Sequence, residues 1–195
     1  MGVGRILMDR WVFMNRLIPL SLLPGLMLAQ GLSRPQVMRL APSVPSPPNV
    51  VDRMLEAAHL KPGETVYDLG SGDGRVLITA AQKFGAKAVG VEISKDFVAS
   101  SSKRIHDLKL DEKVQIIEGD LLKVDLSKAD VVTLYLLTKS NDLLRPQLEK
   151  QLKPGARVVS HDYAIRGWQP VRVETVESHK RAHQLYVYEF PVQKQ

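Results

Sequence analysis

Three glycines at alternate positions follow an acidic residue in the segment 66–75, which reads VYDLGSGDGR. The apolar run before Asp68 is typical of a buried strand, and the apolar periodicity after Gly74 is typical of a helix. Glycines between a strand and a helix let backbone N–H groups approach a ligand at the helix N-terminus. The segment therefore predicts a ligand-binding loop, although a plain helix-packing turn would share its glycines. The loop residues expected to bind are Gly70, Ser71, Gly72 and Gly74.

The acid before the glycines indicates what kind of ligand the loop binds. A dinucleotide fingerprint has the spacing G-x-G-x-x-G and places a pyrophosphate at the helix N-terminus. Here the spacing is G-x-G-x-G, and the carboxylate of Asp68 would repel a pyrophosphate but attract an amino group. S-adenosylmethionine carries both a cationic amino-acid end and a sulfonium. The pattern therefore favours S-adenosylmethionine as the cofactor.

Two further acids stand at the ends of the next two predicted strands. Glu92 ends the second strand, where its carboxylate can accept hydrogen bonds from two ribose hydroxyls. Asp120 follows the third strand, where it can accept from the adenine amino group while Leu121 packs on the ring. Ligands of open α/β sheets bind along the carboxyl edge, so acids at three consecutive strand ends favour one cofactor site. Asp73 and Arg75 either contact the cofactor or cap the loop and pair at the surface.

Strand and helix patterns alternate along the chain from Glu64 onward. Short apolar strands separated by helices form right-handed βαβ crossovers, which give a mostly parallel sheet covered on both faces. The fold class is therefore α/β and Rossmann-like, closed by an antiparallel hairpin of Val171–Glu174 and Leu185–Phe190. The other predicted strands are Thr65–Leu69, Ala88–Glu92, Val114–Ile117, Asp130–Leu136 and Ala156–Ser160, and the predicted helices are Arg75–Phe84, Lys95–Leu108, and a stretch interrupted at Pro146 that ends at Leu152.

Three parts divide the chain: a hydrophobic leader over residues 1–29, a proline-rich linker over 30–45 and a folded domain over 46–195. The apolar run in the leader is shorter than the roughly 20 residues of a membrane-spanning helix. It fits a secretory signal ending at Ala29, an organelle presequence, a membrane-surface anchor or a disordered start. We expect an exported, organellar or membrane-tethered protein whose folded domain is soluble. Ser46 and Pro47 predict the start of a helix that continues to about Leu60.

Charge and composition exclude several functions. The net charge is +6, but residues 1–45 hold five arginines and one aspartate, so only +2 remains for residues 46–195. A nearly balanced domain does not predict a nucleic-acid partner. The chain has no cysteine, which excludes disulfides and a cysteine nucleophile. No metal is expected, because no metal-ligand spacing relates carboxylates to His59, His106, His179 and His183.

With these motifs the chain resembles the class I methyltransferases. Within them it is similar to the small lysine methyltransferases of adenine nucleotide translocase and the ATP synthase c subunit, with their prokaryotic relatives. The resemblance implies a seven-stranded sheet with an antiparallel last strand, S-adenosylmethionine as cofactor and a protein lysine as acceptor. One departure concerns the acceptor: the translocase enzymes carry a Phe-Gly-Val-Pro-like turn after the fourth strand, whereas residues 135–138 read YLLT. The likeness is carried by residues 42–46, 68–75, 146–149 and 156–159 and by Trp168 with Pro170.

The acceptor side is expected at the same edge of the sheet, beyond the fourth and fifth strands. Methyl transfer from a sulfonium is an in-line displacement in which positioning and desolvation do most of the work. Tyr135 ends the predicted fourth strand, and His161 and Asp162 follow the fifth. These three residues are the acceptor-side candidates. A core aromatic at Tyr135 and satisfied loop polarity at His161 are the alternatives.

These observations predict an S-adenosylmethionine-dependent methyltransferase that modifies a lysine on a protein partner. A small molecule or a lipid as acceptor is the alternative within the enzyme class. A non-catalytic Rossmann-like binding module is the alternative outside it, and the formation of S-adenosylhomocysteine distinguishes the two. Membrane association is expected through the leader.

Overall fold

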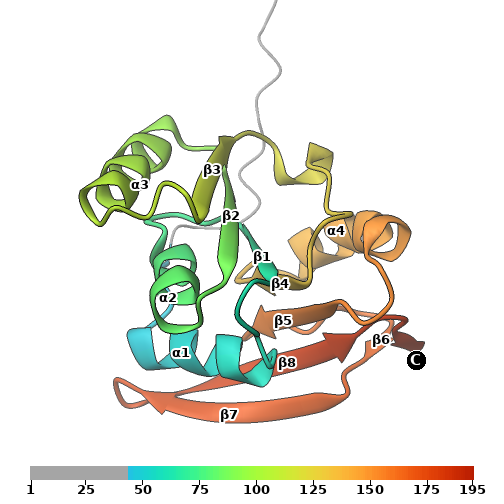
Figure 1. Cartoon of the computed structure of the whole chain (residues 1–195). Coiled ribbons are helices and arrows are strands. Elements are labelled where there is room, and N and C mark those ends of the chain that lie inside the picture. Colours follow the sequence, from blue (N-terminus) through green and yellow to red (C-terminus); the bar gives the residue numbers. More distant parts are fainter. Residues whose placement is uncertain (1–43) are drawn as a thin grey trace, which may run out of the picture. The chain divides into compact units, whose positions relative to one another are not determined.

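The computed structural model describes residues 44–195. The expected leader and most of the expected linker lie outside the described residues, and so do the predictions made for them. Within the described part, no helix has the length and apolar character needed to cross a membrane. The described residues form the α/β Rossmann-like fold that the sequence predicts (Figure 1).

A seven-stranded sheet forms the centre of the fold, with the strand order β3-β2-β1-β4-β5-β8-β7. The first five strands along the chain pair in parallel, whereas β8 runs antiparallel to β5, and β7 antiparallel to β8. The mostly parallel sheet with a closing antiparallel hairpin is therefore confirmed. Its strands are β1 (Thr65–Leu69), β2 (Lys87–Glu92), β3 (Val114–Glu118), β4 (Val131–Leu134), β5 (Arg157–His161), β7 (Arg172–Ser178) and β8 (Arg181–Glu189), while β6 (Trp168–Gln169) and β9 (Gln193–Lys194) pair separately.

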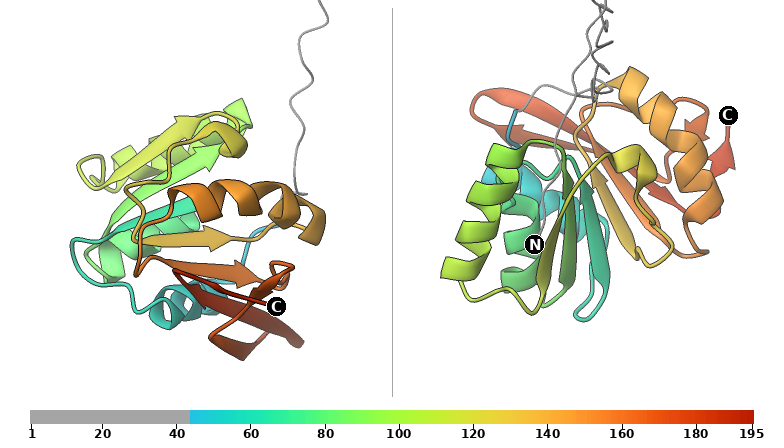
Figure 2. Two further views of the ribbon diagram at one scale, coloured as in Figure 1. Left: turned by 90° about the vertical axis from the view of Figure 1, so that its right-hand side faces the viewer. Right: turned by 90° about the horizontal axis from the view of Figure 1, so that it is seen from above.

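Helices cover both faces of the sheet (Figure 2). Successive side chains of a strand point to opposite faces, so the two faces have separate cores. Val66 of β1 packs into the core shared with α1 and α2, and its neighbour Tyr67 packs into the core shared with α4. The helices on the first face are α1 (Pro48–Ala57), α2 (Arg75–Lys83) and α3 (Lys95–Asp107), and those on the second are α4 (Thr138–Gln151) and the short 3-10 helix η1 (Leu121–Lys123).

The start of α1 differs from the prediction. Pro47 occupies the N-cap position and Pro48 the first helical position, whereas Ser46 was expected to cap the helix. Ser46 does not cap because its hydroxyl lies 2.9 Å from Nδ1 of His161, a distant residue of β5. The helix also ends at Ala57, earlier than expected. A residue whose local pattern indicates a cap is therefore used in a tertiary contact.

Helix α4 continues through Pro146, where the sequence predicted an interruption. A proline inside a helix removes one backbone hydrogen bond and crowds the preceding turn. Leu144 and Leu148, on either side of the proline, are completely buried against the sheet. Burying two leucine side chains contributes about 3–6 kcal/mol, which is enough to offset the cost of the proline.

The closing hairpin is longer than the two predicted strands. Only two residues, His179 and Lys180, connect β7 to β8. Their φ angles are positive, at 48° and 62°. Such two-residue turns match the twist of a hairpin and usually contain glycine or asparagine. The polar pair at 179–180 lacks this signal, so the sequence predicted a wider turn.

Candidate active site

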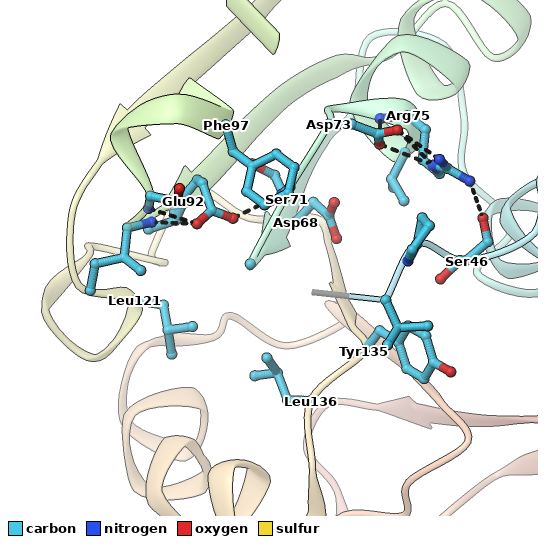
Figure 3. Close-up of a pocket in the computed structure, with 18 of the residues that line it drawn as sticks. Ser46, Asp68, Ser71, Asp73, Arg75, Glu92, Phe97, Leu121, Tyr135 and Leu136 are labelled. Carbon is cyan, nitrogen blue, oxygen red and sulfur yellow. Dashed lines mark hydrogen bonds and ion pairs between the residues drawn. The ribbon is translucent and has the colours of Figure 1, made fainter. Parts of the chain in front are cut away.

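A pocket of about 330 Å³ opens at the carboxyl edge of the sheet (Figure 3). The ends of β1, β2 and β4, the segment after β3 and residues 44–46 form its wall. Most of the residues predicted to bind the cofactor lie here together: Asp68, Gly70, Ser71, Gly72, Glu92, Asp120 and Leu121, with Tyr135 from the acceptor side. Gly74 lies just outside the wall as the N-cap of α2.

The glycine loop connects β1 to α2 through backbone conformations that other residues rarely adopt. The φ angle is 88° at Gly70 and 50° at Gly72. The N–H groups of Gly70 and Ser71 donate to the carbonyl oxygen of Val91, which holds the loop against β2. The hydroxyl oxygen of Ser71 is buried and has no hydrogen-bond partner among the described residues. This hydroxyl packs against Gly90 of β2, so the Ser71 side chain supports the loop.

Glu92 stands at the end of β2 with three backbone donors around its carboxylate. Oε2 accepts from the N–H of Gly72 at 2.9 Å, and Oε1 accepts from the N–H groups of Ile93 and Ser94, each at 2.8 Å. A carboxylate has about four lone-pair sites, so one site remains on Oε2. Glu92 therefore ties the glycine loop to β2 and still presents one acceptor position to a ligand.

Asp68 is nearly enclosed, with 7% of its surface exposed. Its Oδ1 accepts a hydrogen bond from Oγ1 of Thr133 on β4 at 2.7 Å. Burial raises the pKa of the Asp68 carboxyl to about 7; the hydrogen bond from Thr133 opposes the rise, and the charges of Glu92 and Asp73 add to it. Near neutral pH this carboxyl is therefore partly protonated, and a cation beside it would favour the ionised form.

Apolar side chains line the pocket near Glu92 and Asp120. Leu121 and Leu136 lie across the pocket from Glu92 and Phe97 (Figure 3). Oδ1 of Asp120 caps η1, and its Oδ2 lies 3.8 Å from Nζ of the exposed Lys123, which can turn away into solvent when a ligand binds. The sequence interpretation missed Phe97, although an aromatic residue in the first turn of the helix after Glu92 was a usable signal.

Residues 44–46 form part of the pocket wall, which no local pattern in the sequence indicated. The guanidinium of Arg75 holds this segment by donating to the carbonyl oxygen of Ser46 at 2.7 Å. Arg75 also donates to both carboxylate oxygens of Asp73, and these hydrogen bonds lower the pKa of Asp73. The Asp73–Arg75 pair therefore connects the glycine loop to the segment before α1.

Tyr135 and Ser46 lie at the end of the pocket opposite Glu92, with Asp68 between the two ends (Figure 3). Tyr135 directly follows β4, and its ring stacks on that of His161 with centroids 3.8 Å apart. Its hydroxyl donates to Oδ2 of Asp162 at 3.2 Å. His161 and Asp162 are not part of the pocket wall, so of the three acceptor-side candidates only Tyr135 faces the pocket.

His161, the last residue of β5, is completely buried and has a partner at each ring nitrogen. Nδ1 lies 2.9 Å from Oγ of Ser46, and Nε2 lies 2.8 Å from Nδ1 of His183. Burial lowers the pKa of His161 to about 4, although the charge of Asp162 opposes this shift. The antiparallel pairing of β5 with β8 brings His183 to this position, and the sequence spacing had not indicated the contact.

Comparison with known protein families shows which family the chain belongs to. A family model described as the ANTKMT methyltransferase domain matches residues 68–172, more than half of the chain. The chain belongs to this methyltransferase family. A protein-lysine N-methyltransferase of Saccharolobus islandicus is 48% identical over 148 residues, which are 75% of this chain and 92% of the relative. The adenine nucleotide translocase lysine N-methyltransferase of Mus musculus is 32% identical over 76% of this chain, which spans 65% of that enzyme.

This methyltransferase is also similar in three-dimensional structure to a solved relative. The RNA methyltransferase from Salinibacter ruber, crystallised in complex with S-adenosyl-L-homocysteine, is 44% identical with a TM-score of 0.72, covering 78% of this chain and 97% of that chain. The chain is therefore an S-adenosylmethionine-dependent methyltransferase, and the predicted fold, enzyme class and cofactor are confirmed.

The methyltransferase pocket fits this cofactor on observations of its own. The loop glycines leave room for a ligand against the backbone, since a Cβ at Gly72 would meet no atom within 4 Å. Asp68 is a carboxyl whose ionised form a nearby cation would stabilise, and the cofactor carries an amino group. Glu92 has an acceptor position that the described residues do not use, and the second oxygen of Asp120 faces only the exposed Lys123, at 3.8 Å.

Gly90 on β2 of the methyltransferase packs against the glycine loop, a contact that the sequence interpretation missed. A Cβ atom at this position would lie 2.5 Å from Cδ1 of Leu77, 2.6 Å from Oγ of Ser71 and 2.9 Å from Cβ of Ser71. Gly90→Ala is therefore expected to push the loop out of place. We expect a loss of about 1–3 kcal/mol in the free energy of unfolding, together with weaker cofactor binding. Urea denaturation and calorimetric titration measure both.

A second substitution tests whether the contact with Ser71 is the cause. Ser71→Gly removes the two atoms at 2.6 and 2.9 Å, whereas the flexible end of Leu77 can move aside. The double variant Ser71→Gly/Gly90→Ala should therefore regain stability relative to Gly90→Ala alone. A Gly90→Ala protein with the stability and cofactor affinity of the wild type would show that the loop does not depend on this space.

Proposed function

We propose that this methyltransferase transfers a methyl group to the side-chain amine of a lysine on a protein. The observation that carries the proposal is the apolar surface that Tyr135, Leu136, Val44 and Pro45 give to the acceptor end of the pocket. The acids of the wall have other partners, because Asp68, Glu92 and Asp120 are proposed to bind the cofactor and Asp73 is paired with Arg75. An apolar end favours the neutral amine of a lysine, which is the form that accepts a methyl group. The names of the relatives from Saccharolobus islandicus and Mus musculus support the same acceptor.

RNA is the second candidate acceptor, because the relative from Salinibacter ruber is described as an RNA methyltransferase. Recognition of single-stranded RNA uses a basic groove and aromatic rings on which bases stack. Residues 46–195 carry a net charge of only +2, and the aromatic residues of the pocket wall are Phe97 and Tyr135. Phe97 lies at the Glu92 end, so Tyr135 alone would serve a base at the acceptor end. These features favour lysine.

The proposed cofactor contacts follow from the acceptor positions in the pocket. Asp68 would accept from the cationic amino group, and Glu92 would accept from one ribose hydroxyl through the open site on Oε2. Oδ2 of Asp120 would exchange the exposed Lys123 for the adenine amino group, while Leu121 packs on the ring. The backbone of the loop would approach the amino-acid end at Gly70, Ser71 and Gly72, and Gly74 would set the direction of α2.

The cofactor supplies an electrophilic methyl group on a sulfonium, and the acceptor end of the pocket supplies position and a dry environment. Tyr135, Leu136, Val44 and Pro45 contribute apolar surface to the wall. A free lysine side chain has a pKa near 10.4, and an apolar wall disfavours its ammonium form. Lowering that pKa increases the fraction of neutral amine, which is the nucleophile. Methylation should therefore rise with pH.

His161 and Asp162 are proposed as positioning residues. His161 contacts Ser46 through a ring nitrogen and supports the Tyr135 ring by stacking. Asp162 accepts from the Tyr135 hydroxyl. Together they fix both residues at the acceptor end of the pocket without reaching it themselves.

We further infer that the functional domain includes Val44 and Pro45, because both line the pocket. The division into a leader over residues 1–29, a linker over 30–45 and a domain over 46–195 otherwise stays a prediction. The same holds for export, an organelle or a membrane as the destination that the leader specifies.

The acceptor class can be identified by following a labelled methyl group. The purified full chain is incubated with radiolabelled S-adenosylmethionine and an extract of its own cells, which is then divided and digested with either protease or nuclease. We expect protease-sensitive label, and mass spectrometry of the labelled protein should place it on lysine. Label that only nuclease removes, or that stays in the lipid or small-molecule fraction, would contradict the lysine acceptor and leave the methyltransferase assignment standing.

Tyr135 is expected to matter for turnover more than for cofactor binding, because it lies at the end of the pocket opposite Glu92. Tyr135→Ala removes the aromatic wall and should lower kcat about 10- to 100-fold, with the cofactor dissociation constant nearly unchanged. Tyr135→Phe keeps the ring and should retain most of kcat. Equal losses in both variants would show that the hydroxyl, and not the wall, is what the reaction needs.

A further inference from the structure

Three potential metal ligands converge behind the acceptor end of the pocket. Nε2 of His161 lies 2.8 Å from Nδ1 of His183, which lies 3.1 Å from Oδ2 of Asp162, and the third side of this triangle is 3.5 Å. His161 and His183 are buried, and 9% of the Asp162 side chain is exposed. Within residues 44–195, this is the group of three such side chains whose geometry can hold an ion.

We propose that His161, Asp162 and His183 form a binding site for a divalent transition-metal ion, with Zn²⁺ as the best fit. Zn²⁺ binds histidine nitrogen and carboxylate oxygen at about 2.0–2.2 Å with tetrahedral angles, which places neighbouring ligand atoms roughly 3.3 Å apart. The three observed separations, 2.8, 3.1 and 3.5 Å, lie around this value. Two histidines and one carboxylate are also a donor set that zinc commonly takes.

Hydrogen bonds around the cluster hold the ligands in the orientation that an ion needs. The Nδ1 atom of His161 is engaged by Oγ of Ser46 at 2.9 Å, so its Nε2 is directed at the cluster. Oδ1 of Asp162 accepts from the N–H of Gln184 at 3.0 Å, so Oδ2 is the oxygen that faces the two histidines. Partners of this kind fix the ring orientation and the carboxylate of metal ligands.

Hydrogen bonds among the three ligand atoms satisfy them less completely than a bound ion would. In neutral rings a single proton lies between Nε2 of His161 and Nδ1 of His183, and whichever nitrogen carries it, that proton must also serve Oδ2 of Asp162. An ion at the centre uses all three lone pairs at once. Arg181 and Tyr135 also donate to Oδ2 of Asp162, at 2.9 and 3.2 Å. Arg181 is 59% exposed and free to turn away into solvent.

The site connects parts of the fold that the acceptor end depends on. Its ligands come from the end of β5 and from β8, and His161 carries the connection to Ser46 and Tyr135. A bound ion would therefore stiffen the wall opposite Glu92. Three protein ligands also leave a fourth position, which is typical of zinc sites that hold a water or a substrate.

Metal titration of the intact chain tests the proposal without reference to methyl transfer. The protein is stripped with a chelator and titrated with Co²⁺, followed by its visible absorption, and then with Zn²⁺ in competition and by calorimetry. We expect one equivalent to bind, with the intense Co²⁺ bands of a tetrahedral site, and Zn²⁺ should raise the melting temperature. Failure of the wild-type protein to take up a stoichiometric ion would overturn the proposal.

Matched variants locate the ion. His183→Gln should weaken Zn²⁺ binding by at least about 100-fold. His106→Gln is the control, because His106 is an exposed histidine 3.3 Å from a carboxylate oxygen of Asp111 and no residue of the described range 44–195 supplies a third ligand there. It should bind Zn²⁺ as the wild type does. Equal affinity in the two variants, each shown to be folded by its cofactor affinity, would place any bound ion elsewhere and contradict the site.

Discussion

Replacing Glu92 by alanine is expected to lower the affinity for S-adenosylmethionine by about 100-fold. The charge-assisted hydrogen bond to the ribose contributes about 1.5–3 kcal/mol, a factor of roughly 10 to 150. The substitution also removes the acceptor of the N–H groups of Gly72, Ile93 and Ser94, so the glycine loop loses its tie to β2. Calorimetric titration of S-adenosylmethionine measures the effect.

Glu118→Ala is the matched control for Glu92→Ala. Glu118 is the register partner of Glu92 at the end of β3, but half of its side chain is exposed and it lies outside the pocket wall. Its removal should leave the affinity unchanged. A folded Glu92→Ala protein with the affinity of the wild type would contradict the assignment of the ribose site.

Replacing Asp68 by asparagine is expected to have opposite effects on stability and on cofactor binding. Burial of the Asp68 carboxyl raises its folded-state pKa to about 7, so the ionised form destabilises the protein without cofactor. Asparagine can still accept the hydrogen bond from Thr133 and carries no charge to desolvate. The variant should therefore be more stable than the wild type at pH 8 and bind S-adenosylmethionine far more weakly, because the partner of its amino group is gone.

The stability difference between the wild type and Asp68→Asn should change with pH in a defined direction. A carboxyl with a raised folded-state pKa holds its proton more tightly in the folded than in the unfolded protein. Between the unfolded value near 3.9 and about 7, the wild type should therefore lose stability relative to Asp68→Asn by about 1.4 kcal/mol per pH unit. Above this range the difference should be constant. Urea denaturation of both proteins across this range measures the difference.

Cofactor affinity should follow the same ionisation in the opposite direction. The wild type should bind S-adenosylmethionine more tightly as the pH rises toward 7, because the Asp68 carboxylate forms, and binding below pH 7 should release a proton. Thr133→Val removes a hydrogen bond that favours the ionised form, so it should move this rise to higher pH. A flat affinity profile in the wild type would contradict the pairing of Asp68 with the amino group.

The parts of the site that depend on local pattern were predictable from the sequence. Asp68 and Glu92 lie at the end of a strand, the glycine loop and Asp120 follow one, and parallel strands bring their carboxyl ends to one edge. The face of the sheet on which a side chain packs is equally local, since consecutive residues such as Val66 and Tyr67 belong to opposite faces. For this reason the sequence alone predicts the fold and the cofactor.

The parts that depend on distant contacts were not predictable. His183 meets His161 only because β8 pairs with β5, and Ser46 reaches β5 although its position before a proline indicated a helix cap. Gly90 looks like an ordinary strand residue, and its role appears only where the glycine loop packs on it. In each case the partner is fixed by tertiary packing, for which the sequence has no periodicity or spacing.

The placement of the methyl donor is tested most directly by a crystal structure of the full chain with S-adenosylhomocysteine. We predict density in the pocket with the amino-acid end at Asp68, a ribose hydroxyl within hydrogen-bond distance of Oε2 of Glu92, and the adenine beside Leu121. The sulfur should face the end formed by Tyr135 and Ser46. Density in a reversed orientation, or outside this pocket, would contradict the assignment of both the cofactor site and the acceptor end.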